Sequence, residues 1–90
     1  MEFDWDDRKA EANLVKHGVP FEEAMTVFDD RLFVDFYDPD HSLDEHRYII
    51  IGESDRRRLL VVSYTEVFGA VRIISARELT RAERKLYEEG

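Results

Sequence analysis

Apolar and polar positions along this 90-residue chain follow a pattern that predicts two helices, a run of strands and a last helix. Residues 7–17 have helical spacing, with Asp6 or Asp7 suited to cap the first turn and Gly18 suited to end the last one. A second helix is predicted over residues 20–28, because a proline at a first helical position precedes an apolar helical face. The first third of the chain should therefore be mainly helical.

The middle of the chain is rich in β-branched and aromatic residues, which predicts an antiparallel meander. The four predicted strands cover residues 33–37, 47–52, 59–66 and 70–76. Before them, Phe3 and Trp5 alternate with acidic residues, which fits either a short strand or an anchoring segment. After them, Thr80 and Glu83 form a capping-box pattern that starts the last helix. The pattern predicts an α+β fold with two N-terminal helices, a four-stranded antiparallel sheet and a C-terminal helix, one sheet face being covered and the other partly open.

Length and composition set the scale of this fold. A chain of 90 residues buries only about 60–65% of the surface that it exposes when unfolded, so we expect a single domain over residues 1–90. Hydrophobic residues make up 43% of the chain, which is enough for one thin core. The absence of cysteine excludes a disulfide framework, a thiolate metal site and a cysteine nucleophile. With no signal-peptide pattern and only short apolar runs, we expect a cytoplasmic protein without a membrane partner.

Charge is distributed unevenly along the sequence. The net charge of −8 argues against a nucleic-acid partner, because Lys and Arg supply most of the affinity for phosphate. Residues 1–55 hold five Lys or Arg and sixteen Asp or Glu, whereas residues 56–90 hold eight and five. This split is compatible with an acidic surface for a basic partner and a separate cationic patch for an anionic substrate, and equally with an ordinary soluble domain.

Short motifs occur in a fixed order along nearly the whole chain. They are Phe3-Asp4-Trp5-Asp6, Lys9, Asn13, Lys16-His17-Gly18-Val19, Phe21, Glu23, Ala24, Glu45, Arg47, Ile51-Gly52, Tyr64-Thr65-Glu66, Arg72-Ile73-Ile74-Ser75-Ala76-Arg77, Glu83-Arg84 and Tyr87. Each motif alone is weakly specific. The ordered set resembles the BrnT family of toxins from bacterial toxin–antitoxin pairs.

This resemblance implies a fold similar to that of RelE-type toxins and an endoribonuclease activity that halts translation. It also implies neutralisation by a BrnA-type antitoxin, with the pair binding its own promoter, so that DNA is contacted only through the antitoxin complex. One position departs from the family, since Val67 stands where an arginine commonly follows the Thr-Glu pair. Loss of one such electrostatic donor commonly lowers turnover by about 10²–10³-fold. The resemblance therefore leaves two alternatives, an active or weakened ribonuclease and an inactive homologue that acts as an antitoxin-binding co-repressor.

RNA can be cleaved without a metal or cofactor if a base deprotonates the 2′-hydroxyl, a cation stabilises the phosphorane and an acid protonates the leaving oxygen. Glu66, at the end of a predicted strand, is a candidate base, and Arg72 on the next strand could face it across the hairpin, with Arg77 farther along. Period-two alternation places Tyr64 on the same face as Glu66 and Thr65 on the other. The alternative is structural: Tyr64 packs in the sheet, Glu66 pairs across the ladder, and Arg72 lies at a solvated edge.

Other basic residues are secondary candidates. Lys9 could contact phosphate or pair with an acid at helical spacing, and His17 could act in catalysis or stabilise the C-terminus of a helix. Arg56, Arg57 and Arg58 form the densest cationic cluster, which could bind RNA by charge or form an ordinary polar turn.

The segment between the first two predicted strands is acidic. Its carboxylates are Asp38, Asp40, Asp44 and Glu45, and two histidines, His41 and His46, lie near them. Their spacing matches no recognised metal signature, and loop carboxylates are usually solvated, so we expect no metal there. Exposed aromatic residues near this segment and the last hairpin could mark the antitoxin surface, although most should be core: Phe33, Phe36, Tyr37 and Phe68.

Overall fold

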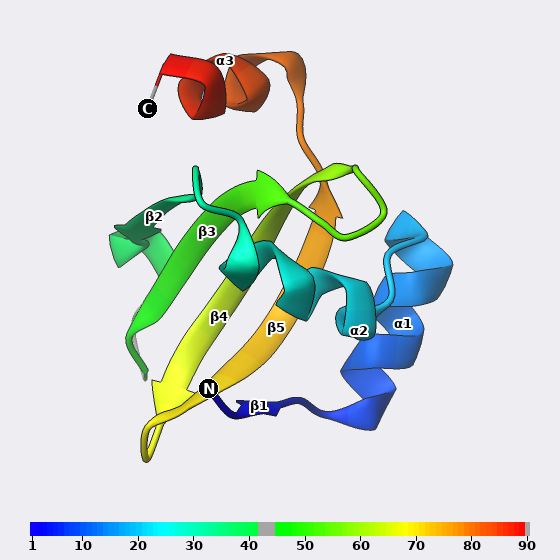
Figure 1. The fold of residues 1–90 in the computed structure, drawn as a ribbon. Coiled ribbons are helices and arrows are strands. Elements are labelled where there is room, and N and C mark those ends of the chain that lie inside the picture. The colour runs from blue at the N-terminus through cyan, green and yellow to red at the C-terminus, as the bar shows by residue number, and fades with distance from the viewer. Residues whose placement is uncertain (42–44, 90) are drawn as a thin grey trace.

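A five-stranded sheet forms the centre of the computed structural model, which describes residues 1–41 and 45–89 (Figure 1). The strands are β1 (Phe3–Asp4), β2 (Val34–Tyr37), β3 (Arg47–Glu53), β4 (Leu59–Val67) and β5 (Ala70–Glu78). Their order across the sheet is β1-β5-β4-β3-β2. β1 is parallel to β5, and the other neighbouring strands are antiparallel. The predicted α+β class and the antiparallel meander are confirmed.

Helical segments connect β1 to β2 and β2 to β3, and a last helix follows β5. They are α1 (Asp7–His17), α2 (Phe21–Ala24), the 3₁₀ helices η1 (Met25–Asp29) and η2 (Pro39–His41), and α3 (Arg81–Glu89). The Asp6 carboxylate caps α1 by accepting two backbone N–H groups at 2.8 and 3.2 Å, and Gly18 ends the helix at φ 70°. At α3, the Glu83 N–H donates to the Thr80 hydroxyl at 3.3 Å, and the Thr80 N–H donates to the Glu83 carboxylate at 2.9 Å. The predicted caps and capping box are confirmed.

The prediction of one helix over residues 20–28 is wrong in detail. The α-helix covers only Phe21–Ala24, Pro20 is its cap rather than its first helical residue, and a 3₁₀ helix continues to Asp29. Thr26 lies where the two meet, and its hydroxyl donates to the carbonyl of Glu23 at 2.7 Å. Such a side-chain bond competes with regular backbone pairing, which favours the tighter turn.

The fifth strand corrects the predicted four-stranded sheet. Phe3 and Asp4 lie opposite Val71 and Arg72 in parallel register, and the Val71 N–H donates to the Glu2 carbonyl at 2.8 Å. The Phe3 ring also packs edge-on against Phe28, with ring centroids 5.2 Å apart. A two-residue strand is too short to show a period in the sequence, and its partner lies far along the chain.

The helices leave the two sheet faces in different environments. α2 and η1 cross one face, and α1 lies along the β5 side (Figure 1). The core on the covered face contains Val19, Phe21, Ala24, Val27, Ile50, Leu60, Val62, Tyr64, Val71, Ile73 and Ala76. α3 flanks one end of the opposite, open face without burying any of its own residues. Among the helices of the described residues, none has the length and apolar character needed to cross a membrane.

Candidate functional site

The pairing of β4 with β5 contains one irregularity. Ser63 lies opposite Ser75, whereas the next residue of β4, Tyr64, lies opposite Ile73. Ile74 is therefore an extra residue in β5, as in a β-bulge. Side chains alternate between the faces of a strand, so this extra residue resets the alternation along β5.

The reset brings Arg72, Ser75 and Arg77 to one side of the sheet. Arg72 is paired with Thr65 and Arg77 with Val61. Thr65 and Val61 are separated by an even number of positions in β4, so their side chains point to the same face of the sheet. That side is the open face, because Val61, Ser75 and Arg77 line a hollow there. In an unbulged strand the two arginines, five residues apart, would point to opposite faces.

Asn13 joins α1 to the edge of β5. Its side-chain amide donates to the Ala76 carbonyl at 2.8 Å and to the Val19 carbonyl at 3.0 Å, and it accepts the Ala76 N–H at 3.0 Å. These bonds replace those that a neighbouring strand would supply to Ala76. Because Asn13 is only 7% exposed, loss of the amide would leave buried backbone groups unpaired. This residue therefore fixes the position of α1 beside β5.

Two neighbouring hollows follow from this arrangement. One, of about 220 Å³, lies between α1 and β5, and the other, of about 350 Å³, lies between β2, the centre of the sheet and α3. They share Ile74 and Ser75, so we treat them together as the open-face groove. The groove is lined by Lys9, Ala12, Asn13, Lys16, His17, Phe36, Asp38, Arg47, Ile49, Ile51, Val61, Ser63, Ile74, Ser75, Arg77, Glu83 and Leu86.

The cations of the groove differ in how they are held. Arg77 makes two parallel bonds of 2.7 Å to Glu83 of α3. The hydrogen bonds and charge of this arginine lower the pKa of Glu83 to about 2, despite the opposing effect of burial, and the pairing raises the pKa of Arg77. Within residues 1–41 and 45–89, by contrast, Lys9 and Lys16 have no ion-pair partner, and both side chains are exposed. The groove thus contains exposed lysines beside an arginine that already binds a carboxylate.

The predicted apposition of Glu66 and Arg72 across the hairpin is wrong. Glu66 lies opposite Val71 on the covered side, whereas Arg72 lies opposite Thr65 on the open side. The two-residue turn after Val67 sets this register, because Val67 pairs with Ala70. Arg72 instead forms an ion pair of 2.5 Å with Asp4 of β1. Residues that are close in a hairpin still point apart when their positions differ by one in the register.

Tyr64 does share a face with Glu66, as predicted, because their partners Ile73 and Val71 both lie in the core. Its hydroxyl donates to both carboxylate oxygens of Asp35 at 2.8 Å. Burial and this carboxylate raise the pKa of Tyr64. The side chain is 4% exposed and belongs to the core, which favours the structural interpretation over an acid at the open face.

The three consecutive arginines are not equivalent. Arg58 donates to Glu23 through Nε at 2.9 Å and Nη2 at 2.5 Å, and through Nη2 to the Gly18 carbonyl at 3.1 Å. Glu23 also accepts the Ser54 hydroxyl at 2.6 Å, and the bond from Arg58 lowers its pKa. Arg58 therefore joins the end of α1, the start of α2 and the β3–β4 loop, which is a structural role. Arg56 and Arg57 are exposed, with side chains 67% and 89% accessible, and lie outside the open-face groove.

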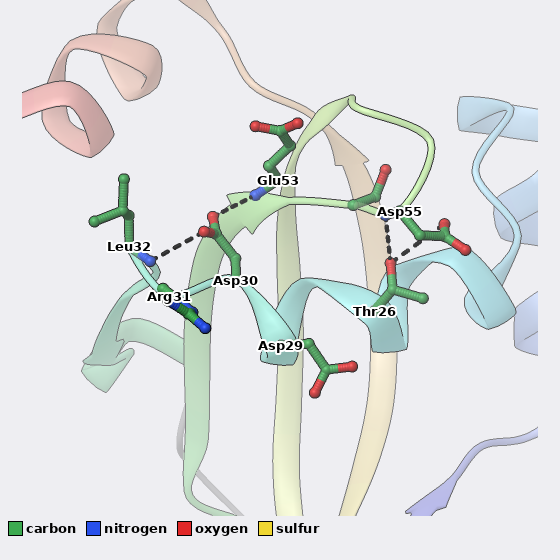
Figure 2. A pocket seen from close by; sticks show the side chains of 8 residues that line it. Thr26, Asp29, Asp30, Arg31, Leu32, Glu53 and Asp55 are labelled. Atoms are coloured by element: carbon green, nitrogen blue, oxygen red, sulfur yellow. Dashed lines mark hydrogen bonds between the residues drawn. The ribbon is translucent and has the colours of Figure 1, made fainter.

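A separate acidic hollow lies beside η1 (Figure 2). Asp30 lines this hollow, and its carboxylate accepts the N–H groups of Leu32 at 3.0 Å and Glu53 at 2.7 Å, together with the Tyr87 hydroxyl at 2.6 Å. Burial alone would raise the pKa of Asp30, but these hydrogen bonds outweigh it and lower the pKa. Beside it, Thr26 accepts the Asp55 N–H at 2.9 Å. These contacts attach η1 to the β3–β4 loop and to α3.

The acidic segment after β2 yields no metal centre in the part of the chain that the structure describes, since no three ligating side chains converge there. His46 lies 3.2 Å from the Tyr37 hydroxyl through its Nδ1. Asp44 lies outside the described residues. The aromatic residues considered for a partner surface are all substantially accessible: Phe33 at 46%, Phe36 at 39%, Tyr37 at 44% and Phe68 at 105%. The expectation that most of them are core is therefore wrong.

Sequence reasoning missed Asn13, Ser75 and Glu83 as residues that shape the groove. An asparagine inside a predicted helix was the available signal, because this residue is a poor helix former and is retained where its amide has a partner. Ser75 and Glu83 gave no such signal, because their place depends on the bulge in β5 and on how α3 returns to the sheet.

Comparison with known proteins bears on this geometry. Residues 5–83 match the family described as "Ribonuclease toxin, BrnT, of type II toxin-antitoxin system". The crystal structure of the Brucella abortus ribonuclease toxin BrnT superposes with a TM-score of 0.66 at 25% identity, over 90% of this chain and 99% of that one. No curated protein sequence matches the chain. The family match covers most of the chain, and the shared fold agrees with it, so this chain belongs to the BrnT family of ribonuclease toxins of type II toxin–antitoxin systems.

Proposed function

We propose that this chain, acting as a single domain over residues 1–90 in the cytoplasm, is a metal-independent endoribonuclease that inhibits translation and is neutralised by a BrnA-type antitoxin. Its RNA substrate binds along the open-face groove. The observation that carries this proposal is the gathering of basic groups of α1 and β5 around Ser75 on one uncovered face of a protein whose net charge is −8. Promoter DNA is contacted only through the antitoxin complex.

The groove offers a proton-transfer group and several cations for metal-free cleavage. His17 and Ser75 line the same hollow, and an imidazole side chain can act as a general base or a general acid. Lys9, Lys16 and Arg77 supply positive charge for the phosphorane. Arg72 lies on the same face and extends this charge toward the hairpin. Glu66, on the covered side, is less suited to act as the base than His17.

Incubation of purified protein with a defined single-stranded RNA in excess EDTA tests this proposal. Wild type should cleave the RNA, and His17→Ala should lose most of the activity, because the proton-transfer group contributes about 10²–10⁴-fold. His46→Ala is the matched control, since this histidine packs against Tyr37 outside the groove. RNA that stays intact with wild type, or equal cleavage by His17→Ala, contradicts the proposal.

Val67 favours a second candidate function, an inactive homologue that binds the antitoxin and acts as a co-repressor. Val67 lies two residues after Thr65 in β4, so both side chains are on the same face of the sheet. An arginine at position 67 would therefore point to the open face near Arg72. Its side chain is 40% exposed and carries no charge. If only Val67→Arg cleaves RNA and arrests growth when expressed without the antitoxin, the wild-type chain is this inactive partner. Growth arrest by wild type excludes it.

A further inference from the structure

The part of the open-face groove between β2 and α3 differs chemically from the part beside α1. Its floor is apolar, formed by Ile49, Ile51 and Val61, of which Ile51 is 1% and Val61 6% exposed, and Phe36 of the terminal strand β2 also lines it. Polar groups stand around this floor: Asp38, Arg47, Ser63, Ser75, Arg77 and Glu83. A hollow of about 350 Å³ with an apolar floor and a few polar groups has the dimensions of a small-molecule site.

The residues that line this hollow and the adjoining one indicate which kind of ligand fits there. A flat group with an apolar face and polar edges fits an aromatic wall and a polar rim, and a nucleobase is such a group. Phe36 keeps 39% of its surface accessible, and proteins that bind single strands stack unpaired bases on aromatic side chains. The adjoining hollow has the exposed Lys9 and Lys16, which suit the phosphates on either side of a base.

We propose that this hollow, the base pocket, binds one unstacked nucleobase of the RNA, with Phe36 as the stacking residue. The inference rests on the proposed function and deepens it. Ser75 lines both hollows, so the base in the pocket belongs to the nucleotide next to the phosphate held between α1 and β5. Phe36 is thus a specificity-determining residue, whereas the basic residues bind the backbone of any sequence.

The experiment measures binding to a 2′-O-methyl RNA decamer, which cannot be cleaved, and to ten versions of it that each lack one base. Fluorescence anisotropy gives the Kd of each. For wild type, we expect one abasic position to weaken binding about 5- to 150-fold, the range that stacking on one aromatic side chain provides. For Phe36→Leu, which keeps apolar bulk but has no aromatic face, the loss at that position should disappear. Phe36→Tyr should restore it, and Phe33→Leu, an exposed aromatic residue outside the groove, should behave as wild type.

The outcomes separate the base pocket from the ribonuclease. An abasic scan without a sensitive position, or the same sensitivity in Phe36→Leu as in wild type, overturns the base pocket. If wild type still cleaves natural RNA in that case, the proposed function stands, and the hollow would instead bind a side chain of a partner protein. If wild type neither binds nor cleaves RNA, both proposals fail.

Discussion

Glu23 and Arg58 form one ion pair of this molecule, Glu83 and Arg77 form another, and the two pairs differ mainly in their surroundings. Both include two hydrogen bonds between one guanidinium and one carboxylate. In the first pair the Glu23 side chain is 1% exposed and Arg58 is 28% exposed, whereas Arg77 and Glu83 are 40% and 27% exposed at the open-face groove. We therefore expect that loss of the pair with the buried Glu23 charge destabilises the fold, whereas the Arg77–Glu83 pair can be exchanged for a phosphate contact at a smaller cost in stability.

Removing the arginine of the buried pair should have the largest effect on folding. Arg58→Ala leaves the buried Glu23 charge without its main partner and should lower the free energy of unfolding by about 3–5 kcal/mol, measured by urea denaturation. Arg57→Ala, at a fully solvated neighbour, is the control and should change it by less than about 0.5 kcal/mol. Equal stabilities for the two variants would show that the pair of Glu23 and Arg58 contributes little to folding.

Removing the arginine of the exposed pair should affect turnover instead. Arg77→Ala should change the free energy of unfolding by less than about 1 kcal/mol, because the pair is partly solvated. Cleavage of RNA in excess EDTA should fall by about 10²–10³-fold, as expected for loss of a cation that stabilises the transition state. Arg84→Ala on α3 is the control outside the groove. A large stability loss with little change in turnover would show that Arg77 acts in folding rather than in cleavage.

The carboxylate of the exposed pair competes with RNA for Arg77. Glu83→Gln keeps the oxygen that caps α3 but removes the charge, so RNA affinity should rise about fivefold, equivalent to about 1 kcal/mol. Glu88→Gln changes the net charge equally on an exposed part of the same helix and controls for the general effect. Equal affinities for these two variants would mean that Glu83 does not hold Arg77 away from phosphate.

Acid should weaken the exposed pair. The pKa of Glu83 is lowered from 4.5 to about 2, so the unfolded chain takes up its proton at a higher pH than the folded chain does. This contribution to stability is complete above about pH 4.5 and is lost as the pH falls toward 2. The free energy of unfolding of wild type should therefore fall more steeply over this interval than that of Glu83→Gln, which no longer titrates there. Parallel curves would contradict the shift.

The local signals of the sequence predicted most of the fold. Asp6, Gly18, Thr80 and Glu83 act through backbone groups within a few residues, so their roles as caps are legible in the chain itself. The four longer strands are also marked by their own composition. The pairing of β1 with β5 was not predictable, since it depends on residues far apart in sequence.

The candidate site was predictable only in its residue types. Arg72 and Arg77 were identified as candidates, but their common face depends on the extra residue Ile74, and no sequence signal marks a bulge among β-branched residues. The assignment of Glu66 to the same face as Arg72 failed for a related reason, because the register of a hairpin decides which neighbours share a side. Lys9 and His17 line the groove because Asn13 holds α1 beside β5, through a hydrogen bond to Ala76, which lies more than sixty residues away in the sequence.

The Asn13 amide also bears on how this sheet avoids association with other chains. A strand edge with unpaired N–H and carbonyl groups is a template for aggregation, and Ala76 would present such groups beyond the short β1. Asn13 occupies both of them, so an incoming strand would first have to displace α1. β2 is the terminal strand on the opposite side of the sheet. The other terminal strand, β1, has only two residues, so we expect a chain that extends this sheet to add at β2, next to Phe36, on the side of the groove away from α1.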